Sequence, residues 1–182
     1  MTSPPDDARA DPPGLIAQLL EDWRAHDRDW TRPGFRAVAV HRLGNWGKRA
    51  PRPLRAPVGA LYQALYRGVR NFYGIELPGS VQLGRRVIFE HQSAIVIHEN
   101  AHIGDDCFIR QGVALGSRHL SDPQAAPRLA SGVNVGAGAK ILGAVTVGEG
   151  AQIGANAVVL TNVPAHKLAV GVPARLQTRR PG

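Results

Sequence analysis

The chain has 182 residues, a formal net charge of +8, 43% hydrophobic residues and only 5% aromatic residues. This length suits one domain, and the composition excludes a disordered chain, while the single cysteine, Cys107, excludes an internal disulfide. No apolar run approaches the roughly 18 residues that cross a bilayer, and no basic run is interleaved with stacking aromatics. We therefore expect a cytoplasmic protein that binds neither membrane nor nucleic acid.

The first part of the chain predicts helices. Residues 1–13 are polar and acidic and read as a disordered lead-in, whereas residues 14–74 carry three apolar stripes with spacings of three and four. The segment "APRP" at 50–53 separates the second stripe from the third, because proline interrupts a helix. We expect about three α-helices before residue 75.

From residue 75 to residue 173 the pattern changes to a period of six, which suits neither a helix nor a simple alternating strand. Such a period is typical of a parallel β-helix, in which three hexads of about 18 residues close one triangular coil. The large apolar residue of each hexad should point into the prism, so the fold is predicted to be mainly β. These residues are Leu77, Leu83, Phe89, Ile97, Ile103, Ile109, Leu115, Val135, Ile141, Val147, Ile153 and Val159.

The six-residue period slips twice. Phe89 and Ile97 are eight positions apart, so two extra residues lie near His91. Leu115 and Val135 are twenty positions apart, and the segment between them carries no hexad signal. We expect residues 116–132 to leave the prism as an extruded loop, and insertions into a repeat are a common place for function. Residues 174–182 read as a C-terminal tail.

Several segments resemble the serine acetyltransferase family. They are "GFRAVAVHRLGNW" at 34–46, "VGAGAKILG" at 135–143 and "AVGVPAR" at 169–175. The resemblance runs from about Asp22 to Leu176, although the helical part is much shorter than in typical members. It implies a left-handed parallel β-helix, acetyl-CoA as co-substrate, no metal, and a homotrimer with sites in the grooves between prisms.

The resemblance also implies roles for four residues. The triplet "EHQ" matches the family's catalytic histidine, which makes His91 the general base, and "IELP" matches the segment of its orienting carboxylate, Glu76. Glu90, directly before His91, and Asp29, in "RDW", match residues that contact the acceptor. Spacing supports Glu76 independently: it lies fifteen positions before His91, close to one coil, whereas Glu90 as a strand neighbour should point to the other face.

The expected loop departs from the family. Where members have an arginine and a histidine that help bind the serine carboxylate, this chain has Ala125 and Ala126. Arg118 and His119, earlier in the same loop, are the candidates to replace them. The change favours an acceptor whose carboxylate is absent or masked, such as a carrier-tethered amino acid or a sugar hydroxyl.

Small and basic residues are candidates to hold the co-substrate. Ala137 and Ala155 match family positions near the pantetheine of coenzyme A. Lys140 and Arg175, together with Arg118, are candidates for its phosphates because of their charge.

The sequence thus predicts an acetyl-CoA-dependent transferase that acetylates the hydroxyl of L-serine or a serine-like acceptor. Two other enzymes stay open: an acetyltransferase for a sugar hydroxyl or an amine, and a zinc hydratase resembling γ-type carbonic anhydrases. The hydratase would use His91, His98 and His102, but the spacing of the last two does not match the metal pair of that family. A catalytically idle β-helix that serves as a scaffold is the non-enzyme alternative.

Overall fold

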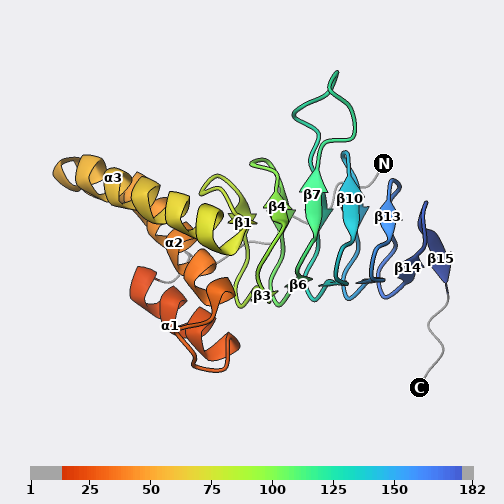
Figure 1. Cartoon of the computed structure of the whole chain (residues 1–182), viewed down its shortest axis with the longest axis horizontal. Helices are drawn as coiled ribbons and strands as arrows, with labels where there is room; N and C mark the ends of the chain where they lie inside the picture. Colours follow the sequence, from red (N-terminus) through yellow and green to blue (C-terminus); the bar gives the residue numbers. More distant parts are fainter. Residues whose placement is uncertain (1–13, 178–182) are drawn as a thin grey trace.

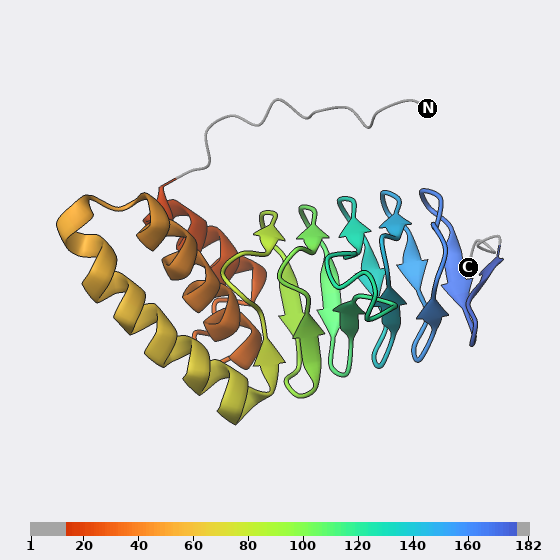
Figure 2. The same ribbon diagram turned by 90° about the horizontal axis from the view of Figure 1, so that it is seen from above.

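The structure is a computed structural model that describes residues 14–177. Three helices are followed by fifteen short strands, most of which wind into a three-sided prism (Figure 1). The helices gather at one end of the prism, beside its first coil, and the later coils stack away from them (Figure 2). The predicted order, about three helices and then a parallel β-helix, is confirmed. The expected disordered lead-in, residues 1–13, lies outside the described residues.

The helical region consists of α1 (Leu15–Ala25), α2 (Pro33–Arg49), α3 (Arg52–Gly68) and one π-helical turn, η1 (Val69–Tyr73). The proline-rich segment separates α2 from α3 as expected, with Pro51 as the N-cap residue of α3. Both helices carry a proline in the first turn, where the missing N–H costs no hydrogen bond.

The strands form three faces, here called sides A, B and C. Side A contains β1 (Ile75–Glu76), β4 (Ile95–Ile97), β7 (Ala114–Gly116), β10 (Lys140–Leu142) and β13 (Val158–Val159). Side B contains β2 (Gln82–Leu83), β5 (His102–Ile103), β8 (Arg128–Leu129) and β11 (Thr146–Val147). Side C contains β3 (Ile88–Glu90), β6 (Phe108–Arg110), β9 (Asn134–Val135), β12 (Gln152–Ile153), β14 (Leu168–Val170) and β15 (Arg175–Gln177). Neighbouring strands are parallel except β14 and β15.

The core of the prism confirms the six-residue period. Every residue of the predicted series is buried except Leu83, which is partly buried in the first coil. A second set of buried residues precedes the first by two positions, because alternate side chains of a strand share one face. Cys107 belongs to this second set, and burial raises the pKa of its thiol to about 11.

The slip near His91 lengthens one coil. Ile75 pairs with Ile95, twenty positions later, whereas Lys140 pairs with Val158, eighteen positions later. The two extra residues lie in the corner between β3 and β4, at positions 91–94.

The extruded loop is shorter than the predicted range of 116–132. Arg128 and Leu129 form β8, which pairs with β5 and β11 inside side B. Leu129 is only 1% exposed and lies six positions before Val135, so it continues the period. The loop separates Leu129 from the earlier hexads, which is why the pattern hid it. Residues 117–127 form the loop that stands out from the prism (Figure 1).

The C-terminal tail also differs from the expectation in its first residues. Arg175–Gln177 form β15, which turns back and pairs with β14 in antiparallel fashion. This short hairpin covers the last coil of side C.

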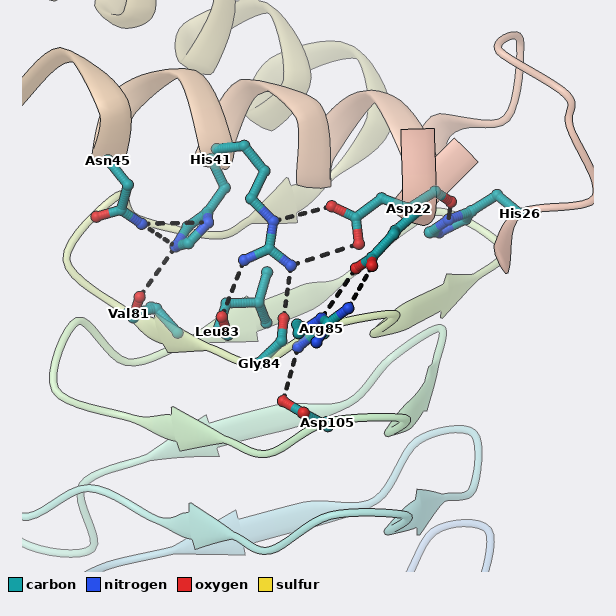
Figure 3. Close-up of polar contacts among 11 residues, drawn as sticks. Asp22, His26, His41, Asn45, Val81, Leu83, Gly84, Arg85 and Asp105 are labelled. Atoms are coloured by element: carbon teal, nitrogen blue, oxygen red, sulfur yellow. Dashed lines mark hydrogen bonds and ion pairs between the residues drawn. The ribbon is translucent and has the colours of Figure 1, made fainter. Parts of the chain in front are cut away.

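Arg42 joins the helices to the open end of the prism through its contacts with Asp22, Leu83 and Gly84, which are labelled in Figure 3. Its guanidinium is buried and donates hydrogen bonds to the carbonyl oxygens of Leu83, at 2.9 Å, and of Gly84. These carbonyls belong to the first coil, whose strands lie at the outer edges of the three sheets. Asp22 from α1, 1% exposed, balances the charge through an ion pair of 2.9 Å. Arg42 thus supplies donors that a further coil would otherwise provide.

Other side chains of the helices bind the same edge. His41 Nε2 donates to Val81 O at 3.0 Å, and Lys48 Nζ donates to Gly79 O at 2.7 Å. The Gly79 amide in turn donates to the hydroxyl of Tyr62 at 2.8 Å. An open sheet edge is a site for unwanted pairing, so this layer of polar contacts closes the end of the solenoid.

Asp22→Asn should remove the counter-charge of a buried guanidinium. We expect the free energy of unfolding, measured by urea denaturation, to fall by about 3–5 kcal/mol. Asp27→Asn is the control, because it breaks the exposed pair between Asp27 and Arg32, whose side chains are 71% and 44% exposed; its loss should stay below about 1 kcal/mol. Equal losses in the two variants would contradict the capping role of the buried pair.

The buried His41 should make stability depend on pH. Burial foremost, with the neighbouring charge of Arg42, lowers the pKa of His41 from 6.5 to about 4. Between these values the unfolded chain binds a proton that the folded chain does not, so stability is full above pH 6.5 and falls as the pH drops toward 4. The loss should reach about 3 kcal/mol in urea titrations. His41→Gln removes the titrating group, so a variant with the same pH slope as the parent would refute this assignment.

Candidate active site

His91 lies at the corner between β3 and β4, where the backbone is unusual. Its φ angle is +66°, and Ser93 and Ala94, at +89° and +54°, also adopt the left-handed region. Few residues other than glycine adopt this region, and such strained positions cluster at functional sites. The side chain of His91 is exposed to solvent. The lengthened corner after β3 therefore presents an accessible imidazole.

His91 begins a line of stacked corners that runs along one edge of the prism. The register that pairs Glu90 with Arg110 continues through β9 and β12, so the residues after these strands lie above one another. The stacked residues are Gln111, Ala137 and Ala155, and the lengthened corner of His91 lies at the start of this edge, where Gly112 N donates to Ser93 O. A backbone hydrogen bond of 2.8 Å from Asn156 N to Ala137 O supports the stacking. The structure thus brings three of the predicted site residues onto one edge.

The two predicted cations, Lys140 and Arg175, lie close to this edge. Lys140 follows one of its corners, and its ammonium donates to the carbonyl oxygen of Gly112. Arg175 is exposed and pairs with Val170, directly before the last corner of the prism.

Glu76 lies on the outer face of side A, where it pairs with Val96 of the next coil. Within residues 14–177 no hydrogen bond or ion pair joins Glu76 to His91. The charge of Glu76 acts instead on Tyr66, whose pKa is raised by burial first and by this carboxylate second. The orienting role of Glu76 therefore stays a prediction.

Asp29 belongs to the turn between α1 and α2. Its carboxylate accepts hydrogen bonds from the hydroxyl and the amide of Thr31, and the hydroxyl contact foremost lowers the pKa of Asp29. A stack of side chains leads from this turn to the corner of His91. Arg36 lies between the rings of Trp30 and Tyr73, at 5.3 and 5.9 Å from their centroids.

The end of this stack touches the His91 corner directly. The carbonyl oxygen of Tyr73 accepts a hydrogen bond of 2.8 Å from Ser93 N. On the other side α2 meets β3 without any side chain between them, because a Cβ at Gly34 would lie 1.9 Å from Phe89 O. The helices therefore hold the α1–α2 turn near the corner.

Glu90 does not stand free. Its carboxylate forms an ion pair of 2.8 Å with Arg110 Nε, one coil further on, and both side chains are 33% exposed. Sequence reasoning did not single out Arg110. The two residues are twenty positions apart, and only the lengthened coil places them side by side.

Arg118 and His119 lie at a different corner, between sides A and B. Together with Asp122 they line a hollow of about 450 Å³ between the loop and the prism. Its other wall includes Leu142, the last residue of β10, and Leu160, directly after β13. Within one chain, Arg118 and His119 therefore lie on a different edge of the prism from Ala137 and Ala155.

His98 anchors the extruded loop, a role that the sequence did not suggest. Its Nε2 donates to Pro123 O at 2.8 Å, while its Nδ1 accepts from Asn100 N at 3.1 Å. The Asn100 amide adds a hydrogen bond to the side chain of Gln124. These contacts tie the tip of the loop to the coil that contains β4.

The three histidines of the hydratase alternative do not converge in one chain. His91 follows side C, His98 follows side A and His102 lies in β5 of side B. Residues 14–177 contain no group of three His, Cys, Asp or Glu side chains that could hold a metal ion.

Within residues 14–177, no helix has the length and apolar character needed to cross a membrane.

The parallel coils and the six-residue period define a hexapeptide-repeat protein. Residues 127–161 match the family described as bacterial transferase hexapeptide (six repeats). The serine acetyltransferase of Synechococcus elongatus is 39% identical over 144 residues, which cover 79% of this chain and 57% of that protein. This chain therefore spans little more than half the length of that relative.

Solved structures agree with the sequence match. A soybean serine acetyltransferase complexed with serine aligns with a TM-score of 0.78 and 32% identity, over 91% of this chain and 70% of that one. A serine acetyltransferase from Brucella abortus in complex with coenzyme A aligns with a TM-score of 0.76 and 30% identity, over 88% and 66%. The chain belongs to the serine acetyltransferase family, and the left-handed hand of the β-helix is confirmed with it.

His98→Ala should release the tip of the loop. We expect faster cleavage at the exposed Arg118 in limited trypsin digestion, because cleavage requires the loop to open locally. His166→Ala replaces an exposed histidine at a corner remote from the loop and should leave the cleavage rate unchanged. An unchanged rate in the His98 variant would show that these hydrogen bonds do not hold the loop.

Proposed function

We propose that the protein transfers an acetyl group from acetyl-CoA to the hydroxyl of L-serine or of a serine-like acceptor. The observation that carries this proposal is the exposed imidazole of His91 at the head of an edge that continues through Ala137 and Ala155. Membership of the family supports the reaction, as do a relative complexed with serine and another in complex with coenzyme A.

His91 would act as the general base. A neutral imidazole is the side chain best suited to take a hydroxyl proton near pH 7. As the imidazole takes the proton, the acceptor oxygen bonds to the thioester carbonyl carbon and a tetrahedral oxyanion forms. The carbon–sulfur bond then breaks, and the imidazolium returns its proton to the departing thiolate. No acyl-enzyme is needed, so the transfer is direct.

Glu76 would orient His91 once substrates are bound. A carboxylate that accepts the second N–H of an imidazole fixes its tautomer and stabilises the imidazolium. Catalytic hydrogen bonds are often long before the substrates arrive, so their absence in the free chain does not argue against the role.

The acceptor would lie between the His91 corner and the α1–α2 turn. Glu90 is next to the base, and Asp29 is held at the turn that the Trp30–Arg36–Tyr73 stack brings toward it. Ala125 and Ala126 support a second candidate, a carrier-tethered amino acid or a sugar hydroxyl, because neither side chain can bind a free carboxylate.

The co-substrate would follow the edge away from His91. Small side chains at Ala137 and Ala155 leave room for a pantetheine arm along the stacked corners. Lys140 and Arg175 supply positive charge beside that edge for phosphate groups.

We further propose a homotrimer in the cytoplasm. Within one chain, Arg118 and His119 lie on a different edge from His91, so a second copy is needed if both groups serve one site. The buried thiol of Cys107 suits a reducing compartment.

His91→Asn should abolish the release of free CoA thiol from acetyl-CoA with L-serine, with a loss of roughly 10²–10⁴-fold in rate. Asparagine tolerates the left-handed backbone, so the corner should keep its shape. His166→Asn is the matched control, because His166 is also exposed and has a φ of +58°.

The acceptor panel would contain L-serine, carrier-bound serine, a sugar and an amine. A rate that depends on His91 with one of them identifies the acceptor class. Thiol release that is unaffected by His91→Asn across the whole panel would refute the catalytic assignment.

A further inference from the structure

Arg110 is fixed beside the proposed base by three contacts. Its Nε pairs with Glu90 at 2.8 Å, and its Nη1 donates to Asn134 Oδ1 at 2.7 Å. The guanidinium also lies 5.6 Å from the centroid of the Phe108 ring. These contacts come from three successive coils of side C, so the guanidinium has a defined position on the outer face of the prism.

The guanidinium of Arg110 can still donate hydrogen bonds to a ligand. Within residues 14–177 no hydrogen bond involves Nη2 of Arg110, and the side chain is one-third exposed. A guanidinium with a free edge matches the geometry of a carboxylate, which it can bind with two parallel hydrogen bonds. The surface beside His91 therefore offers an anion and a cation next to each other.

A free α-amino acid requires the same arrangement. It carries an ammonium and a carboxylate on one carbon, and in serine the hydroxyl is on the next carbon. Glu90 lies next to His91 in the chain, and Arg110 lies beside Glu90 in the next coil. A serine whose ammonium meets Glu90 and whose carboxylate meets Arg110 would direct its hydroxyl toward the imidazole.

We propose that Arg110 determines specificity by binding the carboxylate of a free amino acid acceptor. This inference rests on the proposed function, since it assigns the acceptor of the same site. It places the carboxylate contact on side C, within one chain, and not on the loop, where Ala125 and Ala126 offer no charge. Arg118 and His119 lie on another edge and are not required for it.

Stability alone does not account for Arg110. Ion pairs with this degree of exposure contribute at most about 1 kcal/mol. The exposed pair of Arg86 and Asp106, at 2.6 Å, has the same spacing of twenty positions but no base beside it. This pair makes Arg86 a matched control for Arg110.

The test compares L-serine with ethanolamine, which has the same hydroxyl and ammonium but no carboxylate. In Arg110→Gln we expect about 10- to 100-fold weaker binding of L-serine in calorimetric titrations and a similar rise in KM, with little change for ethanolamine. Arg110→Lys should bind L-serine more tightly than Arg110→Gln does, because lysine restores the positive charge but not the two parallel donors of a guanidinium. Arg86→Gln should leave both ligands unaffected.

The outcomes separate the two proposals. Binding of L-serine that is lost in Arg110→Gln supports the inference even if no acetyl transfer occurs, in which case only the proposed function fails. Unchanged serine binding in Arg110→Gln, an equal loss for ethanolamine, or no binding of L-serine to the unaltered protein would each overturn the inference.

Discussion

The guanidinium of Arg42 donates to the first coil of the prism the hydrogen bonds that a further coil would otherwise supply. A β-helix repeats its backbone hydrogen bonds from coil to coil, so its first coil ends in carbonyls without partners. Arg42 binds two of them from within the protein, and Asp22 makes the burial of its charge tolerable. The helices are therefore more than an appendage, because they complete the hydrogen bonding of the solenoid at the end where the proposed site begins.

That arrangement explains how helices and prism share one site. The same α2 that presents Arg42 to the first coil lies with Gly34 against the backbone of β3. The α1–α2 turn is thereby held beside the corner that follows β3. Closure of the solenoid and packing of the first turn of α2 against β3 are two results of a single packing arrangement.

Much of this architecture could be predicted from the sequence, because each step of six residues corresponds to one side of a coil and places one side chain inside the prism. The series from Leu77 to Val159 gave the inward positions correctly, and the slip after Phe89 located the corner of His91. Leu129 was missed because a loop interrupts the period on which the prediction depends. Adjacent coils also bring together residues whose separation in the sequence depends on the length of the coil, which each insertion changes.

The site was less accessible to such reasoning. Arg110 follows Glu90 by twenty positions, and a coil of eighteen would have paired Glu90 with another residue. Likewise, the fifteen positions between Glu76 and His91 suggested a contact, but within residues 14–177 no hydrogen bond joins them, so the pairing stays a prediction. Spacing predicts neighbours only where the length of each coil is known.

The burial of Cys107 has a consequence for the proposed chemistry. A transferase that uses acetyl-CoA releases a free thiol at every turnover, and accessible cysteines exchange with the disulfides that such thiols form. The thiol of Cys107 is enclosed in the prism and stays protonated, with a pKa near 11. The described residues therefore present no exposed cysteine that could exchange with a disulfide formed by such a thiol.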